Sequence, residues 1–438
     1  MSATNRTRLI WTRFVILLLM LCNTKAYSEV KNIEGKTLSL DECVGIGLQM
    51  NPSAEISLQN LKAAQEKVGE ARGGYYPSFK LSSAYTFTSQ QEKTAGPDAY
   101  DTRFFARQTL YDAGATLNLV EGARQTIKAQ EYDVKKTTLD IILNIKSAVY
   151  EVVKRSDLLD VAKSSLISAK KHLEQAKALY SEGLSPRSDV IKAEVQVSNA
   201  RLDVINAENA ILLAKANLAT AMGLSVTANF EVKAEGTISQ TPLLPTLSDA
   251  ITHAYEWRPE IRGIRARIDS AQANIKQMES GLYPSLSLDA SYGWQKSTFV
   301  PDDKKWGVGL TVSIPIFEQL ITRSKINQAA ANLNGIKATE FQTLRNVELE
   351  VQQAYLSLKE AIERYDVTKK SLEQSEEDMR VSEGRYKEGI GNILEVIDAQ
   401  TALTRARTNN VVVLYDIVSA GAKLDRATGK ESMEEINK

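Results

Sequence analysis

The feature that most constrains the fold is a heptad pattern carried by two long stretches without proline. In each stretch a large residue recurs every seventh position, and a small residue usually follows three positions later. In the first stretch the large residues are Ile145, Val152, Leu159, Leu166, Leu173 and Tyr180. A large-then-small heptad of this length is typical of a coiled-coil seam, in which small side chains let helix axes approach closely. The pattern therefore predicts helix packing rather than ligand binding.

The helical pattern also sets the number and the lengths of the helices. The predicted helices cover about residues 52–73, 112–182, 186–222, 259–281, 318–388 and 392–428. The two longest would each extend roughly 100 Å, because an α-helix rises about 1.5 Å per residue. The helix after each corner (186–222 or 392–428) is called the return helix. Stacked end on with one of the shorter helices (52–73 or 259–281), it would nearly match a long helix in length. Helices of these lengths indicate an elongated protein.

The chain contains an internal repeat. The matched pairs are Asn51-Pro52 with Arg258-Pro259 and Tyr76-Pro77 with Tyr283-Pro284, and the corner at Tyr180–Gly183 with the corner at Tyr386–Gly389. The expected organisation is a first repeat at 40–223 with a β-hairpin at 78–111 and a tip turn at 183–186, an inter-repeat connector at 224–246, a second repeat at 247–429 with a β-hairpin at 284–317 and a tip turn at 389–392, and a C-terminal tail at 430–438. Each repeat therefore reads helix, hairpin, long helix, turn and return helix.

In the two predicted hairpins the sequence period changes from helical to two. In the first strand Phe79, Leu81, Tyr85 and Phe87 share one face, and Lys80, Ser82, Ala84 and Thr86 share the other. Strands of about ten residues with one apolar and one polar face suit a transmembrane barrel, with the apolar face toward lipid. A soluble hairpin with one buried face shows the same pattern. The export signal, the aromatic residues and the recurrence of the strands favour the membrane.

The N-terminus has the composition of a secretory signal peptide, assigned to residues 1–28. Arg6, Arg8 and Arg13 precede an apolar run from Phe14 to Cys22 that is too short to span a bilayer. Cleavage is expected after Ala26 or Ser28. Lipidation at Cys22 is the alternative, and the bulky Leu21 before that cysteine disfavours it.

The composition excludes several classes of function. The 54 basic and 54 acidic side chains cancel, which argues against binding of nucleic acid. The two histidines, His172 and His253, lie far apart, and Cys43 stands alone after the signal peptide. No phosphate-binding loop, dinucleotide fingerprint or catalytic triad signature is present. We therefore expect no enzyme, no catalytic residues, no cofactor and no metal.

A membrane barrel must close, because an open strand edge in lipid leaves backbone groups unpaired. Four strands per chain cannot close around a lumen, and even about eight leave little interior space. Two copies would form a small filled barrel, whereas three copies would supply twelve strands and room for a passage. A homotrimer is therefore the expected assembly for a conduit.

With this repeated organisation the chain resembles the outer membrane factor (TolC) family. The specific pieces are Tyr76-Pro77, Tyr283-Pro284, the two Tyr-x-x-Gly corners and the run from Leu394 to Ala399. The resemblance implies a mainly α fold with a β-barrel part: a trimeric periplasmic α-helical tunnel continuous with a 12-stranded outer-membrane barrel in lipid. It also implies a passive exit duct of a tripartite efflux or type I secretion system, whose partners are a periplasmic adaptor and an inner-membrane transporter.

The candidate site residues lie at the two corners. Glu395 and Asp398 share one helical face, and three copies would place six carboxylates at a narrow end, which favours cations. The resemblance assigns this pair to the gate and joins Tyr386 to Asp189 in tip closure. It also implies an arginine where this chain has Gly391, and Arg187 is the candidate replacement. The alternative for Glu395 is a helix capping box with Asn392 and no role in conduction.

A second class of function competes with the duct. A secreted or periplasmic coiled-coil scaffold or adhesin would carry the same seams, with its hairpins packed on protein instead of lipid. It offers no reason for amphipathic strands to recur at the same place in both repeats.

Overall fold

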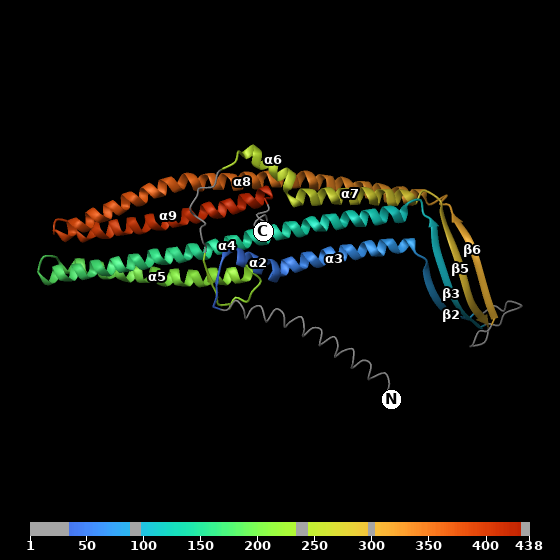
Figure 1. The fold of residues 1–438 in the computed structure, drawn as a ribbon, viewed down its shortest axis with the longest axis horizontal. Coiled ribbons are helices and arrows are strands. Elements are labelled where there is room, and N and C mark those ends of the chain that lie inside the picture. Colours follow the sequence, from blue (N-terminus) through green and yellow to red (C-terminus); the bar gives the residue numbers. More distant parts are fainter. Residues whose placement is uncertain (1–34, 88–97, 234–243, 297–302, 431–438) are drawn as a thin grey trace, which may run out of the picture. The chain divides into compact units, whose positions relative to one another are not determined.

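The computed structural model of the chain describes residues 35–87, 98–233, 244–296 and 303–430. The predicted signal peptide with Cys22, and the tail after residue 430, lie outside the described residues. The elements in chain order are β1 (Thr37–Leu38), α2 (Leu40–Met50), α3 (Pro52–Arg72), the 3-10 helix η1 (Gly73–Tyr75), β2 (Ser78–Phe87), β3 (Asp98–Tyr111), α4 (Ala115–Ser181), α5 (Arg187–Ala221), β4 (Glu231–Val232), α6 (Leu247–Trp257), α7 (Pro259–Ser280), β5 (Ser285–Lys296), β6 (Asp303–Ser313), α8 (Gln319–Lys387) and α9 (Ile393–Thr428) (Figure 1).

The described residues form two compact units, each of which contains segments of both repeats. Unit 1 is built from the described residues up to Ile56, from Lys136–Arg258 and from the described residues from Asn346 onward. Unit 2 is built from Ser57–Lys135 and Pro259–Arg345. Residues of α4 and α8 belong to both units. The units therefore do not coincide with the sequence repeats.

The six predicted helices are confirmed, with ends within a few residues of the expected positions. The two long helices, α4 and α8, contain 67 and 69 residues. The seam pattern also holds, because most of its small residues are buried where helices meet. The buried seam alanines on the return helices α5 and α9 are Ala193, Ala200, Ala214, Ala399, Ala406, Ala420 and Ala427. No described helix combines the length and the apolarity needed to cross a membrane.

In unit 2 the four long strands form one antiparallel sheet in the order β2-β3-β5-β6 (Figure 1). The inner strands β3 and β5 come from different repeats and pair over most of their length, from Tyr100↔Lys296 to Tyr111↔Leu286. Strands β2 and β6 therefore form the outer edges of the sheet. The predicted alternation is confirmed, because the large apolar residues of one face remain exposed. They include Phe79, Leu81, Phe87, Trp306, Val308, Leu310 and Val312, and Trp306 is 76% exposed.

The opposite face of the sheet carries interacting polar side chains. Arg107 on β3 forms an ion pair with Asp289 on β5, and Asp289 also accepts a hydrogen bond from Thr311 on β6. Arg103 pairs with Asp101 at 2.6 Å on β3. This face contains a hollow of about 770 Å³. The sheet thus separates an apolar surface from a charged surface, as the sequence predicts.

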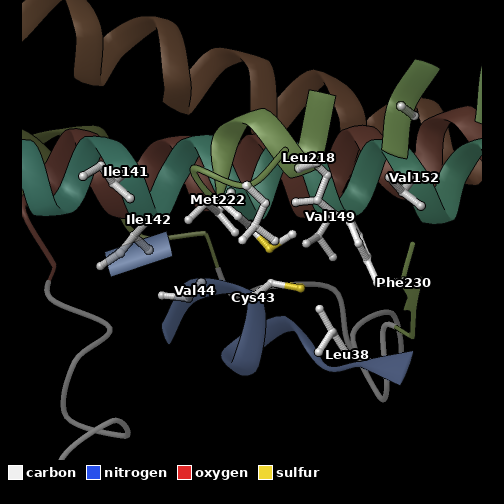
Figure 2. Packing of buried hydrophobic residues seen from close by; sticks show 14 residues of the cluster. Leu38, Cys43, Val44, Ile141, Ile142, Val149, Val152, Leu218, Met222 and Phe230 are labelled. Atoms are coloured by element: carbon white, nitrogen blue, oxygen red, sulfur yellow. The ribbon is translucent and has the colours of Figure 1, made fainter. Parts of the chain in front are cut away.

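One hydrophobic cluster of unit 1 gathers around the end of α5 (Figure 2). Ile145 and Val149 of α4 pack with Leu218 of α5, and Met222 and Phe230 join them from the segment after α5. Further members come from α2 and from β1, which pairs in parallel with β4 through Leu38↔Val232. The sequence analysis did not predict α2, α6 or this two-stranded sheet.

The return helices α5 and α9 end beside Asn51 and Arg258, respectively. These residues directly precede the first prolines of the shorter helices α3 and α7. The Asn51 side chain donates a hydrogen bond to the carbonyl of Ala221 at 2.8 Å, and Arg258 donates to the carbonyl of Ala427 at 3.2 Å. These contacts satisfy carbonyls that have no partner within their own helix. The sequence repeat therefore also repeats one structural contact, here called the join. In each join a side chain caps the end of the return helix.

In the second join the buried Arg258 belongs to a charged network. Arg258 donates to Glu350 at 2.6 Å, and Arg426 contacts both Glu350 and Asp140, at 2.5 Å and 2.6 Å. Burial raises the pKa of Glu350, but the hydrogen bonds and charges of Arg258 and Arg426 outweigh it, so this pKa lies below its usual value. The buried guanidinium is thus compensated by a carboxylate that stays ionised at neutral pH.

We predict that Gly223→Ala destabilises the protein more than Gly183→Ala does. Both glycines have φ near +75°, at 79° and 75°, where an L residue costs about 1–2 kcal/mol. At position 223 an added Cβ would also lie 2.4 Å from the carbonyl oxygen of Met50, whereas nothing lies within 4 Å at position 183. Thermal unfolding of the detergent-solubilised variants, followed by helical circular dichroism, measures the difference in Tm. Equal losses of Tm would contradict the close contact at the join.

Candidate functional site

The corner between α8 and α9 is built by the sequence that follows Tyr386. Gly389 adopts a φ of 73°, and the N–H groups of Gly389 and Ile390 donate to the carbonyls of Tyr386 and Arg385. This is a Schellman ending, which favours glycine at the left-handed position. The corner between α4 and α5 ends in the same way, with Gly183 at the corresponding position. Each long helix therefore ends at a glycine turn.

Helix α9 starts with an Asn392 cap, but the capping box considered as the alternative role of Glu395 does not form. The Asn392 side chain accepts from the N–H of Leu394 at 3.1 Å rather than from that of Glu395. The Glu395 carboxylate instead lies 3.6 Å from the Arg385 guanidinium, and both side chains are about half exposed. The carboxylate is directed toward the preceding helix and not toward the cap, so the capping-box interpretation of Glu395 is wrong in this form.

Glu395 and Asp398 lie on the exposed face of α9, one turn apart. The opposite face is buried: Ile393 and Val396 are fully enclosed in a cluster with Met379 of α8 and Leu403 of α9. Asp398 is exposed and has no ion-pair partner among the described residues. The structure thus brings the two predicted gate residues to one solvent-facing surface.

The predicted closure residues meet at the same end of unit 1 without bonding. Tyr386 is only 3% exposed, and its hydroxyl has no hydrogen-bond partner among the described residues. Burial, with a smaller effect from the Asp189 charge, raises the pKa of Tyr386. Asp189 itself lies 3.8 Å from Lys192. A Tyr386–Asp189 hydrogen bond therefore stays a prediction.

Gly391, which stands where the family resemblance implies an arginine, is tightly enclosed. A Cβ added at Gly391 would lie 2.9 Å from the Tyr386 nitrogen and 3.0 Å from the Arg385 Cβ, which is too close for any side chain without a shift. Arg187, the replacement suggested by the sequence, is the exposed first residue of α5. The guanidinium that approaches the acidic pair belongs to Arg385, which the sequence analysis did not single out.

His172 is a second residue that the sequence analysis did not assign to the site. It is buried on α4, and neither ring nitrogen forms a hydrogen bond with any residue that the structure describes. Burial lowers the pKa of His172, and the Glu383 carboxylate only partly opposes this effect. His253, in contrast, contacts the carbonyl of Thr428 at 3.0 Å and stacks on Trp257. In the described residues no group of three potential metal ligands is present.

Comparison with known proteins places the chain in a family. The model of the family described as outer membrane efflux protein matches residues 47–224 and 250–430. Protein CyaE of Bordetella pertussis is 24% identical over 407 residues, covering 90% of this chain and 84% of CyaE. Outer membrane protein TolC of Escherichia coli is 24% identical over 408 residues, covering 88% of this chain and 81% of TolC. The crystal structure of the outer membrane protein VceC of Vibrio cholerae has a TM-score of 0.75 at 20% identity, covering 89% of this chain and 96% of VceC.

The chain belongs to the outer membrane efflux protein family. It is located in the outer membrane and serves there as an exit duct for efflux. The fold of long helices and amphipathic strands is the one expected from the sequence. Family membership decides against a scaffold or adhesin.

We predict that His172→Leu stabilises the protein more at pH 5 than at pH 8. The pKa of buried His172 is lowered from 6.5, so below pH 6.5 the unfolded chain binds a proton that the folded chain rejects, and stability falls. Above that pH both states hold a neutral ring and this effect vanishes. The difference in Tm between variant and wild type, measured at both pH values, tests the prediction. A difference independent of pH would show that His172 is accessible to protons in the folded protein.

Proposed function

We propose that three copies of this chain form one continuous duct, with a twelve-stranded barrel in the outer membrane and a helical tunnel on its periplasmic side. The observation that carries the proposal is the four-stranded sheet of unit 2. Its edge strands β2 and β6 have no further partner strand in the sheet, and its apolar face is exposed. In lipid such edges must be paired, and three sheets joined edge to edge satisfy both requirements.

Exposed apolar side chains on the helices support association between copies. On α5, Leu202, Ile205 and Leu212 are each more than half exposed. Large apolar side chains at these spacings recur on one side of a helix and suit contact with another helix. A second copy of this chain supplies such a helix. The apolar stripe on α5 therefore supports a homotrimer held together by helix contacts as well as by strands.

The acidic pair supports a gate at the periplasmic tip. Glu395 and Asp398 lie on the exposed face of α9, close to a corner that reverses the chain, and three copies would bring six carboxylates together. A ring of carboxylates at a constriction favours cations. We place Tyr386, Asp189 and Arg187 at this tip as the residues that hold it closed.

The duct is passive and needs no catalytic residue or cofactor of its own. A periplasmic adaptor and an inner-membrane transporter supply the substrate and the energy for export. The two repeats, at 40–223 and 247–429, support a duct whose barrel and tip are built from matching parts. Each repeat contributes one hairpin to the barrel and one helical corner to the tip.

We predict that Glu395→Gln with Asp398→Asn removes the cation selectivity of the duct. The ratio of cation to anion permeability, measured in planar lipid bilayers, should fall by roughly threefold to tenfold, as expected for the loss of fixed charges near a narrow aqueous path. Block by divalent cations added on the periplasmic side should weaken as well.

The matched control is Tyr386→Phe with Asp189→Ala, at the same tip. This variant should raise conductance by loosening the closure while most of the cation selectivity is retained. Wild-type selectivity in the charge-removal variant would place the gate elsewhere in the duct.

A further inference from the structure

We propose that Arg385 sets the charge of the tip: its guanidinium neutralises Glu395, so Asp398 is the carboxylate that selects cations. The inference rests on the proposed function, because it assumes that the exposed face of α9 lines the path of the ions. It assigns unequal roles to two carboxylates that the sequence presents as equivalent.

The first observation is that the corner fixes the position of Arg385. Its carbonyl accepts the N–H groups of Ile390 at 3.1 Å and of Gly391 at 3.0 Å. The absence of a side chain at Gly391 lets the chain turn directly against the backbone of Arg385 and Tyr386. This turn brings the last residues of α8 beside the first turn of α9, where the Arg385 guanidinium lies 3.6 Å from the Glu395 carboxylate.

The second observation is a comparison of the two corners, which are offset by 206 residues from Tyr180 to Tyr386. At this offset Glu395 corresponds to Asp189, Asp398 to Lys192, and Arg385 to Leu179. In the first corner Asp189 pairs with Lys192 at 3.8 Å. In the second corner the lysine is replaced by a carboxylate, and the cation comes from the preceding helix instead.

Both corners therefore compensate the carboxylate in the first turn of their return helix, but by different routes. In the first corner one carboxylate meets one cation. In the second, two carboxylates meet one cation, and Asp398 is left without an ion pair among the described residues. Three copies thus carry three uncompensated carboxylates at this level instead of six.

An exposed ion pair of this kind adds little to stability, but the pairing reduces the effect of the Glu395 charge on a passing ion. A charge next to an opposite charge at close distance acts on its surroundings as a dipole, and its field falls off faster than that of a lone charge. In water a lone charge about 5–10 Å from an ion changes the local ion concentration roughly twofold to fourfold. Arg385 therefore removes most of the contribution of Glu395 to selectivity.

The test is a double-mutant cycle on the full-length protein in planar lipid bilayers, with potassium chloride gradients to measure the permeability ratio. Arg385→Gln should raise the ratio of potassium to chloride permeability about twofold to fourfold, because it releases Glu395. Arg385→Lys is the matched control and should leave the ratio near the wild-type value. Glu395→Gln alone should lower the ratio below the wild-type value, because it leaves the Arg385 charge unpaired, and Arg385→Gln combined with Glu395→Gln should return the ratio close to the wild-type value.

Asp398→Asn separates a failure of this inference from a failure of the proposed function. It should lower the permeability ratio in both backgrounds. If it does so while Arg385→Gln leaves the ratio at the wild-type value, the acidic face lines the path and Arg385 does not compensate Glu395. If neither carboxylate substitution changes the ratio in any background, the face does not line the path, and the proposed gate is wrong together with the role of Arg385.

Discussion

The structure depends on how the backbone groups at the two edges of the four-stranded sheet are paired. The sheet of unit 2 ends at β2 and β6, and its apolar face is covered with exposed side chains such as Phe79, Trp306 and Leu310. In water these features would cause aggregation, and in lipid the unpaired backbone groups at the edges would each be costly. Additional copies of the sheet remove both problems at once. The need for more than one chain in the duct therefore follows from the backbone requirements of the membrane-spanning part.

Each repeat of the helical part is built around one join and one corner. At the join, Asn51 or Arg258 caps the end of a returning helix, which fixes where that helix stops. At the corner, a glycine in the left-handed conformation ends the long helix and the chain reverses. The buried seam alanines keep the paired helices close along their length. Glu395 and Asp398 are exposed at the start of α9, next to this corner.

Long-range periodicity predicted most of the fold, and local contacts account for what it missed. Heptads predicted α4, α5, α8 and α9 closely, and alternation predicted the strands, because both patterns extend over many residues. The pairing of β1 with β4 depends on two residues from each strand, including Leu38↔Val232, and such short strands leave no pattern. The ion pair between Arg385 and Glu395 depends on the direction in which the corner folds back. The Asn392–Glu395 spacing instead suggested a capping box, which the competing Arg385 contact replaces.

The central claim is that three copies of the chain close one barrel and one tunnel. The most direct test is the mass of the intact assembly, released from outer membranes in mild detergent and measured by native mass spectrometry. Since the full chain has a mass of 48.4 kDa, a trimer of full chains is expected at about 145 kDa, with a lower value after removal of the signal peptide. A single species at this mass supports the account. A monodisperse monomer that stays in solution without detergent would contradict it, because its strand edges would need no partner.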